Sequence, residues 1–294
     1  MSIQLDDTSE VALARTMSAA KRLGLYENIL ELHIQGFTIL KDVLSAEEVG
    51  RAREAILDRV EEKTGKRPDL DTTTDSSATT YVPYLLYDDP VFEDILMKER
   101  PLVLIYYLLG ESAKLSSIGS HFKAPGEAGE LALHADTDGG IPSPMPTHGL
   151  VANVNYALVP YSREGGATAV VPASHHWCRQ PTPREKRLGG EHANPHAIAV
   201  DLSPGDCVVW HGNLWHGSFP RTIPGLRVNL AYYFARLSLL GQELHGDRVP
   251  QEALARHADD PRFARLLSRS QFFGWGKEGP NYEIAQQLPV GLFD

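Results

Sequence analysis

The sequence predicts a mainly β protein with flanking helices, in which antiparallel strands form a barrel or sandwich. From about Leu115 onward, short apolar or alternating runs are separated by Gly, Pro and Asp, a pattern typical of such a core. Helical periodicity dominates before this point. No internal repeat is visible, so the 294 residues are expected to form one domain: a mostly helical part (1–112), a β core (113–236) and a helical or loop extension (237–294).

The helical part begins with apolar residues at helical spacing, at Val11, Leu13, Ala14, Met17 and Ala20. Ser45 and Glu48 form a capping-box pattern, so a helix is expected over residues 49–60. The other elements expected here are a second helical stretch, a strand over 36–40, a polar surface loop over 63–80 and a helix over 90–109 that breaks near Pro101.

The core is expected to contain seven strands, each a short apolar or alternating run bounded by turn residues. They are Ser116–Lys123, Leu131–His134, Val151–Val159, Ala167–Val171, Ala197–Leu202, Cys207–His211 and Arg227–Ala235. The extension has a helical candidate over 251–268 and an aromatic, glycine-rich segment over 272–276. Aromatic residues of that segment, and those of 81–87, are candidate walls of a binding pocket.

Composition and charge exclude several functions. The apolar fraction of 42% is sufficient for a packed core, while the net charge of −10 would repel a phosphate backbone, so no nucleic-acid partner is expected. Cys178 and Cys207 are expected to be free thiols, which fits a reducing compartment. Without a signal-peptide core or an apolar run of membrane-spanning length, we expect a cytoplasmic protein and no membrane partner. A homodimer is compatible with the sequence.

The first chemical signal is His134-Ala135-Asp136, at the end of a short apolar strand. In an extended chain residues i and i+2 point the same way, so this imidazole and this carboxylate can bind one ion together. A second signal follows about eighty residues later, where the segment 210–218 contains His211 and His216. Either histidine reaches the same site if the intervening strands wind back across the barrel.

Two histidines and one carboxylate on one face of an ion leave its opposite face open, which is the ligand set of non-haem Fe(II) oxygenases. Catalytic zinc sites also use two histidines and a carboxylate, so these residues alone do not identify the metal. A zinc-dependent hydrolase is therefore one alternative, and a non-catalytic jelly-roll binding protein is another.

A third signal is Arg227, eleven residues after His216, at the start of a strand. Alternation along that strand separates two sets of side chains: Val228, Leu230, Tyr232 and Phe234 on one face, and Arg227, Asn229, Ala231 and Tyr233 on the other. An arginine on the more polar face is what a buried carboxylate would require, because a guanidinium can bind both of its oxygens.

Taken together, these motifs resemble the phytanoyl-CoA dioxygenase family of Fe(II)/2-oxoglutarate oxygenases. The resemblance covers most of residues 36–235 and rests on Leu131–Gly139, Gly165–His175, Gly205–Ser218, Arg227, Gly36–Leu40 and Leu44–Val49. It implies a double-stranded β-helix, or jelly-roll, core of the cupin-like kind. The implied cofactor is Fe(II), with 2-oxoglutarate as co-substrate and O₂ as oxidant.

By this resemblance, the iron ligands would be His134, Asp136 and His216. His216 is preferred to His211 because the family carries its distal ligand in a His-Gly-Ser stretch, with the arginine eleven residues further on. Arg227 would bind the distal carboxylate of 2-oxoglutarate, together with the hydroxyl of Thr168.

The sequence departs from the family pattern at Ala132, where some relatives have a glutamine that helps to hold the co-substrate. The proximal carboxylate of 2-oxoglutarate must then find another partner. Asn153, Asn155 and Lys123, on neighbouring predicted strands, are the candidates for cofactor binding.

The implied reaction is the oxidation of a small molecule, by hydroxylation, desaturation or a related C–H oxidation, with release of succinate and CO₂. Halogenating relatives lose the carboxylate ligand, so Asp136 argues against halogenation. Since no basic patch for CoA phosphates is evident, the favoured substrate is a compact, fairly apolar metabolite, such as those of secondary metabolism. An acyl-CoA or amino-acid derivative is the alternative. The loop 137–149, rich in Gly and Pro, is a candidate lid.

Overall fold

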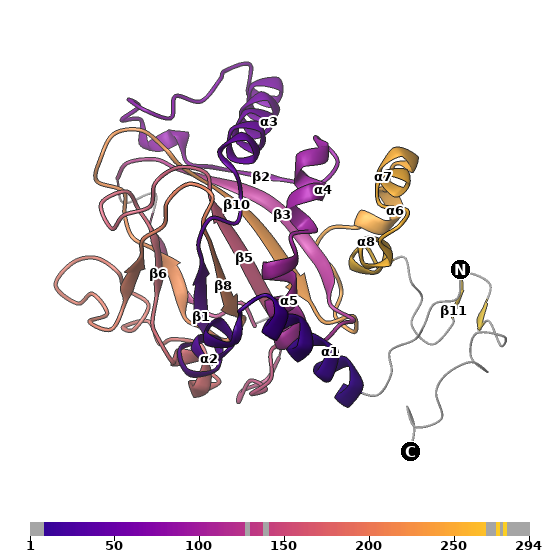
Figure 1. Ribbon diagram of the computed structural model, residues 1–294. Helices are drawn as coiled ribbons and strands as arrows, with labels where there is room; N and C mark the ends of the chain where they lie inside the picture. The colour runs from indigo at the N-terminus through magenta and orange to yellow at the C-terminus, as the bar shows by residue number, and fades with distance from the viewer. Residues whose placement is uncertain (1–8, 127–129, 138–140, 269–274, 277–278, 281–294) are drawn as a thin grey trace.

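A computed structural model describes residues 9–126, 130–137, 141–268, 275–276 and 279–280. Its two main sheets are antiparallel. One has the order β1 (Phe37–Leu40), β8 (Cys207–His211), β5 (Val151–Ala157), β10 (Arg227–Ala235), β3 (Lys114–Lys123) and β2 (Thr80–Pro83). The other has the order β4 (Leu131–His134), β9 (His216–Ser218), β6 (Thr168–Val170) and β7 (Ile198–Val200). This arrangement, drawn in Figure 1, confirms the mainly β jelly-roll prediction.

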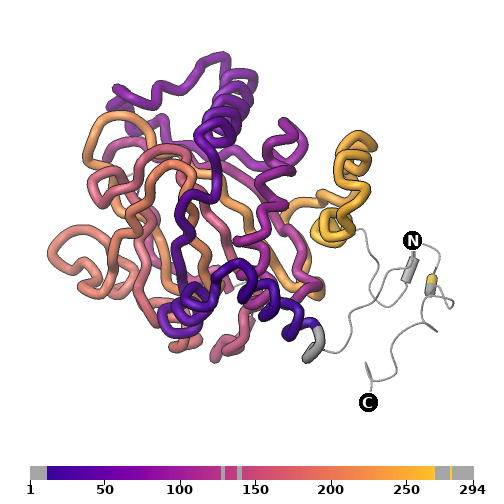
Figure 2. Tube along the Cα trace, viewed as in Figure 1, coloured from indigo at the N-terminus to yellow at the C-terminus, as the bar shows by residue number. Residues whose placement is uncertain are grey.

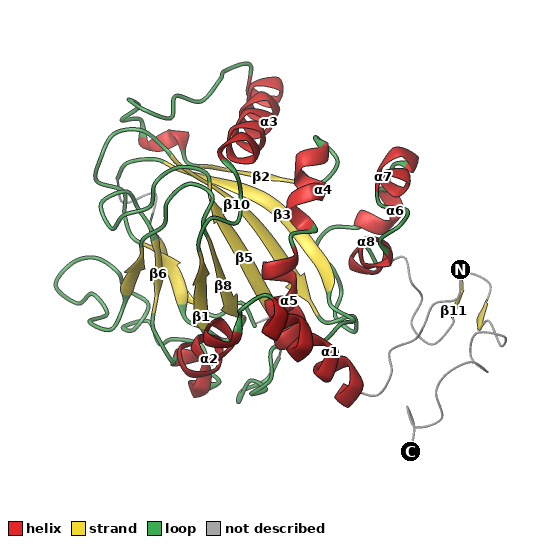
Figure 3. Ribbon diagram, in the orientation of Figure 1, coloured by secondary structure: helices red, strands yellow, loops and turns green. Residues whose placement is uncertain are grey.

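Helices cover the outer face of the six-stranded sheet. They are α1 (Ser9–Arg22), α2 (Tyr26–Gln35), α3 (Ala46–Thr64), α4 (Pro90–Leu96) and α5 (Glu99–Leu109), followed by α6 (His245–Arg248), α7 (Gln251–Arg256) and α8 (Pro261–Leu266). Helix α2 contacts β1, and α5 contacts β5 and β8. Figure 3 shows α6, α7 and α8 grouped at the end of the molecule opposite the four-stranded sheet. Short 3-10 turns, Ser76–Ala78 and Ser174–Trp177, and a small hairpin of Trp275–Gly276 with Gly279–Pro280 complete the described elements.

The main hydrophobic core lies between these helices and the outer face of the sheet. Strand β10 shows why, because its alternation places Val228, Leu230, Tyr232 and Phe234 in this core, each at most 2% exposed. The Tyr232 hydroxyl donates a hydrogen bond of 2.7 Å to the Phe92 carbonyl, so its polar group is satisfied on burial. The predicted alternation of β10 is therefore confirmed, and its other face is left to line the space between the sheets.

Long-range pairing brings an early strand of the chain beside a late one. Figure 2 shows the indigo β1 beside the late strand β8, and the register pairs Phe37 with Trp210. The capping box is also confirmed: Ser45 Oγ accepts from the Glu48 amide, while the Glu48 carboxylate accepts from the Ser45 amide. Both cysteines are free and buried, as predicted. Within the described residues, no helix is long and apolar enough to cross a membrane.

Several element boundaries differ from the prediction. The helix expected over 90–109 is two helices that separate at residues 97–98, and Pro101 lies in the first turn of α5, where a missing N–H group costs nothing. The candidate helix 251–268 is likewise interrupted before Pro261, where the Asp260 side chain caps α8 by accepting from the Arg262 amide. Strands β2 and β9 were not predicted as strands. The seven predicted strands are all present, within two residues at each end.

Candidate metal centre and co-substrate cavity

Two strands of the smaller sheet bring His134, Asp136 and His216 together. Strands β4 and β9 are antiparallel neighbours, and their register places His134 directly opposite His216, with ring centroids 4.4 Å apart. Asp136 follows β4 at the i+2 position; its carboxylate oxygens lie 3.7 Å from His134 Nε2 and 3.5 Å from His216 Nε2. One ligand atom from each of the three residues lies within 4.8 Å of the others, so a single divalent ion fits between them.

The hydrogen bonds of both imidazoles leave their Nε2 atoms free for a metal. His134 Nδ1 lies 3.0 Å from the Ala132 carbonyl oxygen, and His216 Nδ1 lies 3.0 Å from the Leu214 carbonyl oxygen. A carbonyl only accepts, so each Nδ1 carries the proton and each Nε2 keeps its lone pair. Burial also lowers the pKa of His216, against the opposing charge of Asp136, which favours the neutral ring that a metal requires.

The Asp136 carboxylate is held by the opposite sheet. Its Oδ2 accepts 2.7 Å from Asn153 Nδ2 and 3.2 Å from Trp210 Nε1. Asn153 and Trp210 are register partners on β5 and β8, so both donors belong to one cross-strand pair that faces the smaller sheet. Sequence reasoning did not identify Trp210, because an indole has no ligand chemistry and its role depends on the pairing of two distant strands.

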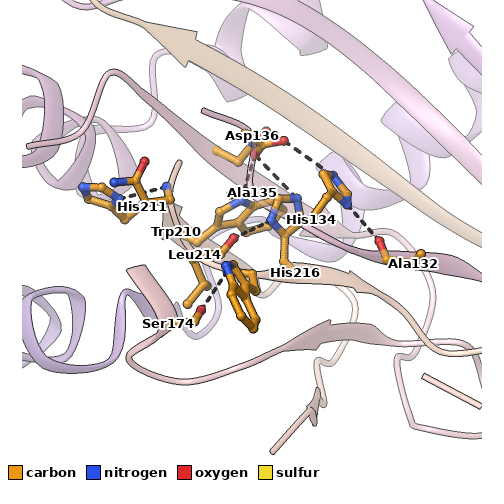
Figure 4. Close-up of polar contacts among 12 residues, drawn as sticks. Ala132, His134, Ala135, Asp136, Ser174, Trp210, His211, Leu214 and His216 are labelled. Atoms are coloured by element: carbon orange, nitrogen blue, oxygen red, sulfur yellow. Dashed lines mark hydrogen bonds and ion pairs between the residues drawn. The ribbon is translucent and has the colours of Figure 1, made fainter. Parts of the chain in front are cut away.

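His211, the first histidine of the segment 210–218, does not join the triad. Strand β8 keeps His211 in the six-stranded sheet, opposite Ala152, whereas the chain turns after it and delivers His216 to the four-stranded sheet. Figure 4 shows His211 on the far side of Trp210 from His134 and His216. His211 packs 5.4 Å from the His175 ring, and burial lowers its pKa to about 3. His175 itself lies in the 3-10 turn Ser174–Trp177 and is buried.

A cavity of about 580 Å³ extends from the triad between the sheets. Its deep end consists of four side chains that are 3–5% exposed: Lys123, Thr168, Ser218 and Arg227. Lys123 and Arg227 are register partners on β3 and β10, and Lys123 Nζ donates to Ser218 Oγ and, at 3.2 Å, to the Phe219 carbonyl. Arg227 donates 3.0 Å to the Gly166 carbonyl and stacks 4.9 Å from the Tyr161 ring centroid. The deep end is thus a buried cationic site.

Two observations show that this end suits an anion. Arg227 Nε is buried and has no hydrogen-bond partner among the described residues. An unpaired buried donor is destabilising, and a ligand that accepts a hydrogen bond from it would remove this cost. Burial, reinforced by the charge of Arg227 and opposed by Glu130, lowers the pKa of Lys123 to about 6. An anion bound here would reverse this shift, because it would compensate both cations.

Gly166 makes the deep end possible. It has a φ of +76°, and a Cβ on it would lie 2.7 Å from Lys123 Cδ and 3.1 Å from Arg221 Cβ. A side chain here would therefore displace Lys123 as well as strain the backbone. The Gly165–His175 motif thus has a structural reason for its second glycine.

The predicted lid and aromatic walls have different outcomes. No described residue of 137–149 lines the cavity; Met145 of that loop packs instead with Trp215 and Cys178, which makes this part of the loop a structural cover. Tyr81 does line the cavity, from the unpredicted strand β2. Residues 272–274, and the side chain of Trp275, lie outside the described residues.

Comparison with known proteins agrees with this geometry. The family model for phytanoyl-CoA dioxygenase (PhyH) matches residues 32–228. The dioxygenase af480 of Aspergillus fumigatus is 30% identical over 225 residues, which cover 76% of this chain and 68% of that protein. The solved structure of HygX from Streptomyces hygroscopicus with nickel and 2-oxoglutarate bound has a TM-score of 0.58 and 20% identity, covering 74% of this chain and 88% of HygX. The non-haem α-ketoglutarate-dependent epimerase SnoN from nogalamycin biosynthesis has a TM-score of 0.51 and 19% identity, covering 73% and 84%.

Fold and relatives together define the class of protein as the non-haem iron oxygenases that use 2-oxoglutarate and O₂. The chain belongs to the phytanoyl-CoA dioxygenase (PhyH) family, as its motifs predicted. The zinc-dependent hydrolase and the non-catalytic binding protein are thereby set aside. The donor set of two imidazoles and one carboxylate fits Fe(II), since such a facial set leaves positions open for a chelating co-substrate.

Proposed function

We propose that this oxygenase oxidises a C–H bond of a small molecule, by hydroxylation, desaturation or a related reaction, with conversion of 2-oxoglutarate to succinate and CO₂. One observation carries the proposal: ligand atoms from residues 82 positions apart converge within 4.8 Å beside a cavity that ends at a buried arginine. Iron and 2-oxoglutarate, when bound, supply the oxidising chemistry. The protein supplies the ligands, the orientation of both substrates and the exclusion of water.

In this proposal His134, Asp136 and His216 hold the iron. Asn153 is a positioning residue rather than a co-substrate ligand, because its Nδ2 group is already used by Asp136. Trp210 acts in the same way and also packs against His216, with ring centroids 4.8 Å apart. These contacts fix the carboxylate so that it presents the remaining oxygen to the metal.

Arg227 and Lys123 bind the distal carboxylate of 2-oxoglutarate, with Ser218 and Thr168 beside them. Ser218 lies on the same face of β9 as His216, two residues or about 7 Å further along the strand, a span comparable with a five-carbon dicarboxylate. Lys123 therefore belongs to the distal end, beside its register partner Arg227. Asn155 is the remaining candidate for the proximal carboxylate, because it lines the cavity and its amide NH₂ group is of the kind that donates to a carboxylate.

The test is succinate formation by the Fe(II)-loaded protein with 2-oxoglutarate, under air, in the presence and absence of small-molecule substrates. Wild-type protein should form succinate with Fe(II) and none with Zn(II), and should bind about one metal ion per chain. His216→Ala should lose metal and activity, whereas His196→Ala, which replaces an exposed loop histidine, should retain both. Succinate formation that is unaffected by His216→Ala would disprove the assignment.

A further inference from the structure

The outer part of the cavity is lined mainly by neutral hydrogen-bonding groups. We call it the mouth and define it as Tyr81, Ser117, Gly119, His121, Tyr233 and Gln242. Tyr81, His121 and Gln242 are exposed, in contrast to the deep end. Tyr81 stacks on His121 with ring centroids 4.4 Å apart, over Gly119, where a Cβ would lie 2.5 Å from the Tyr81 hydroxyl.

Gln242 reaches the mouth from outside the jelly-roll core. Its segment is fixed to β3, because the Gln242 amide donates 3.1 Å to Ser116 Oγ and the Glu243 amide donates 2.8 Å to the Ser116 carbonyl. The buried Glu243 carboxylate accepts from the Tyr84 amide at 2.9 Å and the Ile118 amide at 3.2 Å. Four hydrogen bonds, each donated by a backbone amide, therefore connect Gln242 and Glu243 to β3 and to Tyr84. They fix the backbone from which the Gln242 side chain reaches the mouth.

The two amides that face the mouth and middle of the cavity are both oriented by the protein. Gln242 Oε1 accepts 2.6 Å from Ser117 Oγ, and Asn229 Oδ1 accepts 2.6 Å from the His121 amide. Since each oxygen is engaged, the NH₂ ends of Gln242 and Asn229 remain as donors toward the cavity that both residues line. A ligand that fills this space must offer acceptors, or these donors are desolvated without compensation.

Charge in the cavity is confined to its other parts. Among the described lining residues, Lys123 and Arg227 are the only lysine or arginine, and both belong to the deep end. The acidic lining residues are Asp136, which faces the triad, and Glu130, which lies close enough to Lys123 to influence its pKa. The mouth therefore offers no lysine or arginine for a CoA phosphate or a free amino acid, and its histidine, His121, has a pKa lowered to about 4 by desolvation and by the charges of Arg227 and Lys123.

We infer that the substrate is a neutral, oxygen-rich small molecule, with several hydroxyl, carbonyl or ether oxygens, and that Gln242 is a specificity-determining residue that donates to one of them. The inference rests on the proposed function, because it concerns the substrate of the same cavity. It replaces the fairly apolar metabolite expected from the sequence. An acyl chain would leave the amide donors unpaired, and a site built to hydrogen-bond a polar group discriminates strongly against a ligand that lacks it.

The first experiment measures which compounds bind the holoenzyme and stimulate its succinate formation. Neutral probes are methyl β-glucoside and a hydroxylated macrolactone; contrasting probes are hexanoyl-CoA, hexanoate and leucine. Saturation-transfer NMR on the Ni(II), 2-oxoglutarate-loaded protein gives a binding readout that does not depend on turnover. The neutral probes should bind and stimulate succinate formation, whereas the contrasting probes should do neither.

The second experiment tests Gln242 by changing its donor into an acceptor. Gln242→Glu keeps an oxygen for Ser117 but replaces the NH₂ group, so binding of the neutral glycoside should weaken about fivefold to tenfold. The same variant should bind methyl β-glucosaminide, which carries an ammonium group, better than wild-type protein does. Gln251→Ala is the matched control, because Gln251 is an exposed glutamine of α7 that does not line the cavity. A merely structural role for Gln242 would weaken both ligands equally.

Each outcome has one meaning. Preference for hexanoyl-CoA, hexanoate or leucine, or failure of both neutral probes to bind, overturns the substrate class. Binding of the neutral probes without a change of preference in Gln242→Glu overturns the role of Gln242. Absence of Fe(II)-dependent succinate formation in wild-type protein, with or without any probe, would instead contradict the proposed function itself.

Discussion

The deep end of the cavity and its mouth are built in different ways. The deep end takes its side chains from core strands β3, β6, β9 and β10, and they are almost fully buried and include two basic groups, Lys123 and Arg227. The mouth also depends on the edge strand β2 and on Gln242 from the C-terminal extension, with neutral groups such as Tyr81, which is 46% exposed. On the proposed function, co-substrate binding would depend on strands of the jelly-roll, whereas substrate choice would depend on segments added to it.

The largest effect is expected at the triad of His134, Asp136 and His216. Asp136→Ala removes an anionic ligand and leaves Asn153 and Trp210 without their acceptor, so metal binding is lost. We expect kcat/KM for succinate formation to fall about 10³-fold or more. Metal content and succinate release should be measured on the same preparation. Full activity of Asp136→Ala with bound iron would show that another residue completes the site.

A smaller effect is expected at the deep end. Arg227→Met should raise the KM for 2-oxoglutarate about 100-fold, because the distal carboxylate then loses a buried charged partner. Arg227→Lys should have an intermediate KM for 2-oxoglutarate, because lysine keeps the positive charge but lacks the paired N–H groups that bind both carboxylate oxygens. Arg184→Met, an exposed arginine, serves as the control. An unchanged KM for 2-oxoglutarate in Arg227→Met would show that Arg227 does not bind the co-substrate.

The pH dependence of co-substrate binding tests the same region through Lys123. Its pKa of about 6 means that the free protein holds this lysine mostly neutral above pH 6, and it must take up a proton when a dianion binds. Binding that takes up a proton weakens as pH rises, so the affinity should fall by up to about tenfold per pH unit above 6.

Calorimetry of 2-oxoglutarate binding to the anaerobic Fe(II) protein, in buffers of different ionisation enthalpy, measures this proton directly. Lys123→Met should abolish both the uptake and the slope, whereas Lys186→Met, at an exposed position, should keep them. A dissociation constant that does not change between pH 6 and 8 would contradict the role given to Lys123.

The smallest effect is expected at the mouth. In Gly119→Ala the new Cβ would lie 2.5 Å from the Tyr81 hydroxyl, and the exposed ring is free to move away because it is the end of a flexible side chain. Loss of its stacking on His121 should raise the KM for the organic substrate about threefold and leave the KM for 2-oxoglutarate unchanged. An equal change in both constants would mean that mouth and deep end are not independent.

Parts of the triad and of the deep end were predictable, because their residues follow local spacing along a strand. The i and i+2 positions of His134 and Asp136, and the alternation from Arg227 to Phe234, depend only on the geometry of an extended chain. Asn153 was identified as a residue of the site, but its partner was not, because the hydrogen bond to Asp136 crosses from one sheet to the other. Tyr81 and Gln242 share no periodicity with the core, so nothing local relates either one to the metal.

Period, spacing and side-chain chemistry were enough to predict the class of fold, the family and the candidate metal ligands, but not Trp210 or Gln242. Local spacing left His211 and His216 as alternatives and the family resemblance favoured His216; the tertiary structure shows the physical reason, because each histidine lies in a different sheet. It alone paired Lys123 with Arg227 and brought Gln242 to the mouth. Strand register and the path of a terminal extension are properties of long-range packing, where many weak contacts act together and none is visible in a short segment.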